Sequence, residues 1–143
     1  MAALFLAGCN YDVALTEKPT RQIDTRLLGV WLGGEDGKDT MVVRSLDAST
    51  YVVAMDHDIY RAFHSDFADT GLISVQDLNA DDRRYLYLTA GLSADGNQLT
   101  VRTVSTKVVP EATKGRAALQ KLIQTNLANP KLLGEPLVFT RKK

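Results

Sequence analysis

The chain has 143 residues, the usual size of one domain, and its 45% hydrophobic content is enough for a packed core. Its 17 lysine and arginine residues equal its 17 aspartate and glutamate residues, so the formal net charge is zero and no basic field attracts nucleic acid. A single cysteine excludes an intramolecular disulfide, so the fold depends on packing alone.

The first eight residues carry no charge and lead to the only cysteine, Cys9. Leu6-Ala7-Gly8-Cys9 resembles the lipobox of bacterial lipoproteins, in which the cysteine is acylated and becomes the mature N-terminus. The resemblance implies that residues 1–9 are a lipoprotein signal segment and that Cys9 attaches the protein to a membrane. A signal normally begins with lysine or arginine, which Met1-Ala2-Ala3 lacks, so we expect the true signal to start upstream. The alternative is a short apolar strand or a disordered end with a chance cysteine.

The residue that follows the cysteine indicates a location. In the Gram-negative sorting pattern, aspartate at that position retains a lipoprotein at the inner membrane, whereas this chain has Asn10. The resemblance therefore implies the outer membrane of the cell envelope, with the protein facing the periplasm. No other segment has the roughly twenty apolar residues that span a bilayer. We therefore expect the domain to hang from the membrane surface by its diacylglyceryl group.

Residues 10–26 have no clean hydrophobic periodicity. Residues 16–20 are polar and turn-forming, and Pro19 excludes a long helix through them. We interpret this segment as a tether between the lipid and a folded domain over residues 27–143.

Short apolar or alternating runs follow at even spacing, separated by turn residues such as Asp36-Gly37. The predicted strands cover residues 27–32, 41–44, 50–55, 59–64, 72–78, 85–90, 99–104 and 137–140. In the sixth run Tyr85 and Tyr87 share one face, and Leu86 and Leu88 share the other. The pattern predicts a mainly β domain, an antiparallel meander of about eight strands that closes into a barrel.

One α-helix is predicted before the last strand, at about residues 113–128. Leu119, Leu122 and Ile123 fall on one stripe at helical spacing, and Asn129-Pro130 is a stop signal. We expect this stripe to pack on the sheet or to cover one mouth of the barrel.

The stretch from Ile23 to Trp31 resembles the first signature of the lipocalin and wider calycin group, an aspartate followed by Gly-x-Trp at the first strand. The resemblance implies that Trp31 plugs one end of the barrel beside Gly29 and that Arg141, after the last strand, packs over it as a cation over an aromatic face. The predicted helix precedes the last strand, unlike the order in lipocalins, so the expected fold is a calycin-like barrel. Otherwise Trp31 is simply a core tryptophan of a small β domain.

The whole chain is also similar to a group of small uncharacterised bacterial lipoproteins. The shared features are the Leu-Leu-Gly-x-Trp opening and the stretch Phe63-His64-Ser65-Asp66. That group implies no activity.

The two histidines, His57 and His64, lie near several carboxylates and one serine. The predicted strand separates them by roughly 20 Å, so they do not converge on one metal. His64-Ser65-Asp66 holds the residue types of a hydrolytic triad, but consecutive strand residues point to opposite faces. We therefore predict no metal site, no cofactor and no catalytic residues, and interpret these side chains as turn carboxylates and a hydrogen-bonded histidine.

Strand tyrosines offer candidate ligand-binding residues. Tyr60, Tyr85 and Tyr87, together with His64, could line the barrel interior with apolar rings and polar tips. The alternative is that they lie on the outer face or fill a solid core.

Together these features indicate a lipid-anchored binding or accessory module of the bacterial envelope, without catalysis. Its ligand would be a small amphipathic molecule in the barrel mouth, or an envelope protein. A second hypothesis is a structural or assembly lipoprotein that acts through a protein partner. A third, weaker hypothesis is a hydrolase that uses His64.

Overall fold

A computed structural model describes residues 10–143 of the chain. The segment 1–9, with the predicted lipid site Cys9, lies outside the described residues. The elements, in chain order, are η1 (Thr25–Leu27), β1 (Gly29–Gly33), η2 (Glu35–Gly37), β2 (Asp39–Asp47), β3 (Thr50–Met55), β4 (Asp58–His64), β5 (Ile73–Asp77), β6 (Tyr85–Leu92), β7 (Gln98–Thr103), α2 (Arg116–Thr125) and β8 (Leu137–Arg141).

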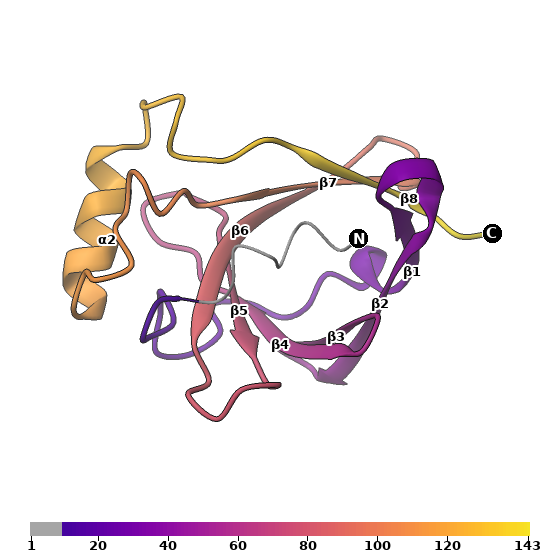
Figure 1. Ribbon diagram of the computed structural model, residues 1–143, viewed down its shortest axis with the longest axis horizontal. Coiled ribbons are helices and arrows are strands. Elements are labelled where there is room, and N and C mark those ends of the chain that lie inside the picture. Colours follow the sequence, from indigo (N-terminus) through magenta and orange to yellow (C-terminus); the bar gives the residue numbers. More distant parts are fainter. Residues whose placement is uncertain (1–9) are drawn as a thin grey trace.

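The eight strands form a closed antiparallel barrel in which each strand pairs with the next along the chain (Figure 1). β8 returns to β1, where Trp31 lies opposite Arg141 and Leu32 lies opposite Thr140. Closure removes the two exposed edges that an open sheet would leave. The structure thus confirms the predicted mainly β fold, with a closed eight-strand barrel and one helix before the last strand.

Short turns connect β1 to β2, β2 to β3, β3 to β4 and β6 to β7, because turn-forming residues stand where these apolar runs end. Asp56 and His57 form the two-residue link between β3 and β4, where Met55 pairs with Asp58. Asp56 has a positive φ of 52°, a conformation that tight hairpins require and that aspartate tolerates better than most residues. This link keeps β3 and β4 in register.

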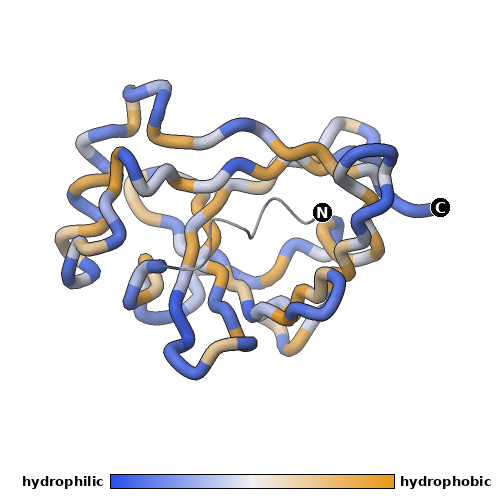
Figure 2. The backbone as a smooth tube through the Cα atoms, in the orientation of Figure 1, coloured by the Kyte–Doolittle hydropathy of each residue, from blue (hydrophilic) through white to orange (hydrophobic). Residues whose placement is uncertain are grey.

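Two apolar clusters flank the barrel wall, one inside the barrel and one outside. The interior cluster comes from alternating inward side chains of all eight strands and includes Trp31, Tyr51 and Tyr60. The outer cluster joins the outer face of β5 and β6 to the N-terminal segment, α2 and the loops around α2. In the tube coloured by hydropathy, apolar and polar residues alternate along much of the wall (Figure 2).

Residues 10–26 were expected to form a tether, and the structure corrects this for the first half of that segment. Tyr11, Ala14 and Leu15 are buried, and Leu15 is fully enclosed in the outer cluster. The backbone of Tyr11 forms an isolated antiparallel bridge with Tyr85 at the start of β6. The sequence of this segment has no local period because its order comes from contacts distant in the chain.

The helix α2 is shorter than predicted and packs against the outer wall instead of covering a mouth. Leu119 and Ile123 are fully buried in the outer cluster, as the apolar stripe predicted. Arg116 and Gln120 donate hydrogen bonds to the carbonyls of Ala14 and Leu15 at 2.9 Å and 2.6 Å. The helix therefore holds the N-terminal segment on the barrel.

Candidate functional site

The barrel interior is almost filled. The remaining central cavity has a volume of about 60 Å³, and apolar side chains such as Val53, Val75 and Leu88 line it together with Tyr51. A volume of this size holds roughly two water molecules at about 30 Å³ each, whereas pockets for small organic ligands measure roughly 300–1,000 Å³. Tyr60, one of the predicted ligand-binding residues, belongs to the surrounding packed cluster. The interior as it stands has no room for an amphipathic ligand.

Trp31 and Arg141 close the barrel where the chain enters β1. Trp31 is fully buried, and its indole nitrogen donates to the carbonyl of Leu27 at 3.0 Å. The guanidinium of Arg141 lies 4.3 Å from the Trp31 ring centre and donates to three backbone carbonyls, those of Arg26, Leu28 and Gly96. The cation over an aromatic face that the resemblance implied for this pair is present in the structure.

The position of Arg141 over Trp31 also explains why a glycine, Gly29, precedes Trp31 by two residues. Gly29 has a φ of +137°, and a β-carbon added there would lie 2.8 Å from Nη1 of Arg141. A side chain would therefore displace the guanidinium and strain the backbone. Gly29, Trp31 and Arg141 form one structural unit, and none of the three is arranged to react.

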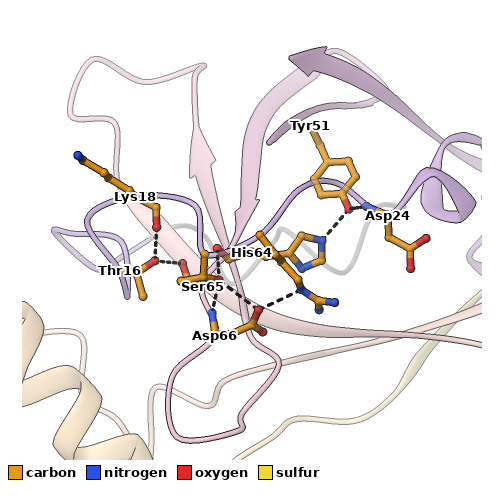
Figure 3. Close-up of polar contacts among 9 residues, drawn as sticks. Thr16, Lys18, Asp24, Tyr51, His64, Ser65 and Asp66 are labelled. Carbon is orange, nitrogen blue, oxygen red and sulfur yellow. Dashed lines mark hydrogen bonds and ion pairs between the residues drawn. The ribbon is translucent and has the colours of Figure 1, made fainter. Parts of the chain in front are cut away.

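His64 is buried at the end of β4 and joins a short chain of hydrogen bonds (Figure 3). Its Nε2 lies 2.7 Å from the hydroxyl of Tyr51, which accepts a hydrogen bond from the backbone N–H of Asp24 at 2.6 Å. Which atom of this pair donates depends on the histidine tautomer, because a neutral imidazole carries its proton on either Nδ1 or Nε2. Nδ1 is buried and has no hydrogen-bond partner in the described part of the chain.

The electrostatic surroundings of this group keep it neutral. Burial, and secondarily the guanidinium of Arg21, lower the pKa of His64 below the usual histidine range. Burial raises the pKa of Tyr51. A neutral histidine paired with a protonated phenol has no activated nucleophile beside it.

Ser65 does not supply that nucleophile, because it faces the opposite side of the strand from His64. Its hydroxyl lies 2.8 Å from that of Thr16 (Figure 3) and 2.8 Å from that of Ser74. The hydroxyl of Ser74 in turn accepts from the backbone N–H of Leu15 at 3.0 Å. These buried serines fasten the N-terminal segment to the barrel wall.

Asp66, the third residue of this stretch, holds the following part of the same segment. Its carboxylate pairs with Nε of Arg21 at 3.0 Å, and its backbone N–H donates to the hydroxyl of Thr20 at 2.8 Å. The backbone N–H of Thr20 donates to the carbonyl of His64 at 2.9 Å. His64, Ser65 and Asp66 therefore contact three different sets of partners and do not assemble into a relay.

Tyr85 and Tyr87, the other predicted ligand-binding residues, face outward and belong to the outer cluster. Tyr87 is fully buried there and stacks on Tyr11 with ring centres 4.5 Å apart. Its hydroxyl donates to the carbonyl of Val13 at 2.6 Å, and the Tyr11 hydroxyl donates to that of Val109 at 2.6 Å. Burial raises the pKa of both phenols. Both hydroxyls are engaged in holding the outer layer.

A cleft larger than the interior cavity lies outside the barrel wall. A cleft of about 240 Å³ runs between the outer face of β6 and β7 and the segment that follows α2. Its lining is formed by Thr70, Leu72, Thr89, Arg102, Leu127, Ala128, Asn129, Pro130, Leu132 and Leu133. No local pattern in the sequence indicates this cleft, because its floor and its roof come from segments far apart in the chain.

Within residues 10–143, no three histidine, cysteine or carboxylate side chains gather in a way that could hold a metal ion. Across the same residues, no helix is both long enough and apolar enough to span a bilayer. Searches of the whole chain against protein-family models, curated proteins and solved structures found no match.

Proposed function

We propose that the protein is a non-catalytic binding or accessory module of the bacterial envelope, anchored to the outer membrane through a lipid on Cys9. Its interactions take place on the outside of the barrel wall. The observation that carries this proposal is the packed interior, where only about 60 Å³ remains free. An eight-strand barrel of this kind serves as a rigid body, and its outer surface is what it presents to a ligand or partner.

The buried polar side chains support a structural role over a catalytic one. Ser65 and Ser74 bind each other and the N-terminal segment, and Tyr51 bridges His64 to Asp24. Hydrolysis through a histidine needs a nucleophile within hydrogen-bond reach and a third group that orients the base. Within residues 10–143, the side chain in hydrogen-bond reach of the His64 ring is the phenol of Tyr51, whose pKa is raised.

The exposed apolar side chains do not favour a large protein interface. Leu46, Ile59, Leu127 and Val138 are the exposed large hydrophobic residues of the described chain, and they lie on β2, on β4, after α2 and on β8. Single exposed apolar residues are normal on soluble surfaces. This distribution favours a small ligand on the outer wall over a partner that covers one face.

A lipid on Cys9 would hold the barrel close to the membrane. Tyr11 is already fixed to β6 by two backbone hydrogen bonds with Tyr85, at 3.0 Å and 2.8 Å. Only Asn10 stands between Cys9 and Tyr11, and two extended residues span at most about 7 Å. The packed N-terminal segment therefore leaves no long tether, and the start of β6 would lie next to the lipid surface.

Intact-mass measurement of the protein from a bacterial membrane fraction tests the anchor. We expect a chain that starts at Cys9 and carries the mass of a diacylglyceryl group, and we expect Cys9→Ser to remove both the mass and the membrane association. Asn10→Asp is the matched control, because it should keep the lipid and move the protein to the inner membrane. An unmodified chain that still starts at Met1 would contradict the anchor.

A further inference from the structure

The outer cleft between β6, β7 and the segment after α2 combines an apolar wall with one unpaired cation. We infer that it binds a small amphipathic carboxylate, with the carboxylate on the guanidinium of Arg102 and the apolar tail against the leucines of the wall. This inference names the ligand class and location for the proposed binding role, and so rests on that role; it does not depend on the lipid anchor.

The floor of the cleft is a row of outward side chains on neighbouring strands. Thr89 on β6 pairs directly with Arg102 on β7. On the opposite side of β6 from β7, Ile73 pairs with Leu88. Leu72, the residue before Ile73, therefore lies beside Thr89. The row thus changes from apolar to polar to cationic across the sheet, which is the order an amphipathic molecule would follow.

The roof is the segment 127–133, and backbone hydrogen bonds hold it in place. Leu133 forms an isolated bridge with Val104, the carbonyl of Leu132 accepts from Ser105, and Gly134 donates to Thr103 at 2.8 Å. Leu132 is buried, whereas Leu127 is 48% exposed at the outer rim. Because the roof is fixed to β7 and the residues after it, the cleft is a preformed feature of the fold.

Arg102 supplies the charge that selects the ligand. Its Nε donates to the carbonyl of Gly134 at 2.9 Å and its Nη2 to that of Leu133 at 3.4 Å. No carboxylate of residues 10–143 lies within ion-pairing distance of this guanidinium, and Nη1 has no hydrogen-bond partner among them. A half-buried guanidinium without a counter-ion attracts an anion, and a carboxylate would add a charge-assisted hydrogen bond.

The volume limits the size of the ligand. About 240 Å³ is below the roughly 300–1,000 Å³ of pockets for drug-sized ligands, so the ligand must be small. Octanoate, with about ten non-hydrogen atoms, matches this size and has one charged end. A ligand this small binds weakly, so we expect a dissociation constant of about 0.1–10 mM.

Titration of the full 143-residue chain with octanoate, followed by ¹⁵N–¹H correlation spectra, tests the site. We expect saturable shifts of the Arg102 Nε signal and of the amides of Leu133 and Gly134. We expect 1-octanol, which has the same chain without the charge, to bind at least about tenfold more weakly. Equal binding of octanol and octanoate, shifts confined to the interior residues, or no saturable shift up to about 20 mM octanoate would each overturn the proposal.

Two variants test whether octanoate binding depends on the charge in the cleft and not on a change in the fold. Arg102→Gln keeps an amide donor for the Gly134 carbonyl and should weaken octanoate binding at least about tenfold. Leu127→Glu places a carboxylate at the exposed rim and should weaken octanoate binding by a similar factor without disturbing the core. This variant tests the site if Arg102→Gln does not fold. Arg44→Gln removes an exposed arginine from β2 and is the matched control, expected to bind as the parent does.

Protein isolated from the cells that produce it, whether from membranes or not, distinguishes failure of this site from failure of the binding role. Native mass spectrometry that finds a co-purifying small molecule retained by Arg102→Gln would overturn the cleft site and leave the binding role intact. An unliganded protein that also fails to bind octanoate would overturn both.

Discussion

The inside and the outside of the barrel wall are both covered by buried side chains, but by different means. The interior cluster is dominated by aliphatic residues of the strands and leaves a cavity of about 60 Å³. The outer cluster draws on the N-terminal segment, the wall and α2, and tyrosine and serine hydroxyls join these parts through long-range hydrogen bonds. Both layers therefore stabilise the fold, and the outer layer also forms the cleft in which we place the ligand.

The largest expected effect is on the interior. Trp31→Ala removes a fully buried ring that fills the barrel and supports Arg141, and we expect a loss of about 3–5 kcal/mol of unfolding free energy. Urea denaturation of the variant and the parent measures this loss. Val138→Ala, at an exposed position of β8, is the control and should change stability by less than about 0.5 kcal/mol. A loss below about 1 kcal/mol at Trp31 would mean that the interior is not tightly packed.

The outer layer should contribute nearly as much. Leu15→Ala truncates a fully buried side chain in the N-terminal segment, and we expect a loss of about 2–4 kcal/mol. Leu46→Ala, at the exposed end of β2, is the matched control and should cost less than about 0.5 kcal/mol. If both variants unfolded at the same denaturant concentration, the N-terminal segment would be a tether after all.

Loss of the contact between Arg141 and Trp31 at the barrel end should have an intermediate effect on the free energy of unfolding. Arg141→Met keeps the apolar stem but removes the cation over Trp31 and three donors to backbone carbonyls, so we expect a loss of about 1–3 kcal/mol. Tryptophan fluorescence should also change, because the indole loses its cationic neighbour. Unchanged stability and an unchanged Trp31 spectrum would show that the guanidinium does not contribute to closure.

The smallest expected effect is the contribution of His64 to the pH dependence of the free energy of unfolding. Its pKa is lowered in the folded protein, so between that value and about 6.5 the unfolded state binds more protons. Stability should then decrease as the pH falls below about 6.5. The groups that face His64 are Tyr51, Arg21, Asp24 and Asp66. Denaturation midpoints between about pH 7 and pH 5 measure the slope.

His64→Gln should flatten this slope, whereas His57→Gln, in the turn before β4, should leave it as in the parent. Hydrogen bonds from Arg26 lower the pKa of Asp24, so this carboxylate adds its own loss of stability only at more acidic pH. Identical slopes for His64→Gln and the parent would show that the buried imidazole does not govern stability in this range.

Local patterns were sufficient to predict the barrel and the place of the helix. Alternation along residues 85–90 correctly separated Tyr85 and Tyr87 from Leu86 and Leu88, because a strand has a period of two. The pattern could not indicate which face is the interior, because the outer layer buries Tyr87 as completely as the barrel buries Leu86 and Leu88. Tyr85 and Tyr87 were therefore placed among interior ligand-binding candidates although they face outward.

The site residues were harder to predict because their partners are distant in the chain. Tyr11 stacks on Tyr87 and Leu15 binds Ser74, and neither contact leaves a periodic signal in residues 10–26. Arg102 belongs to no recognisable sequence motif. It becomes a candidate binding residue because the segment after α2 folds over it. Gly29, Trp31 and Arg141 could be predicted together only because a family signature links them.

The most direct test of the account is an isotope-filtered NOE experiment on the labelled full-length chain with unlabelled octanoate. It reports which methyl groups lie within about 5 Å of the ligand tail. We predict NOEs to the methyl groups of Leu127, Leu132 and Leu133 on the outer wall, and none to Val53, Val75 or Leu88 around the interior cavity. NOEs to the interior residues would contradict the account, because they would show that the barrel opens and carries its ligand inside.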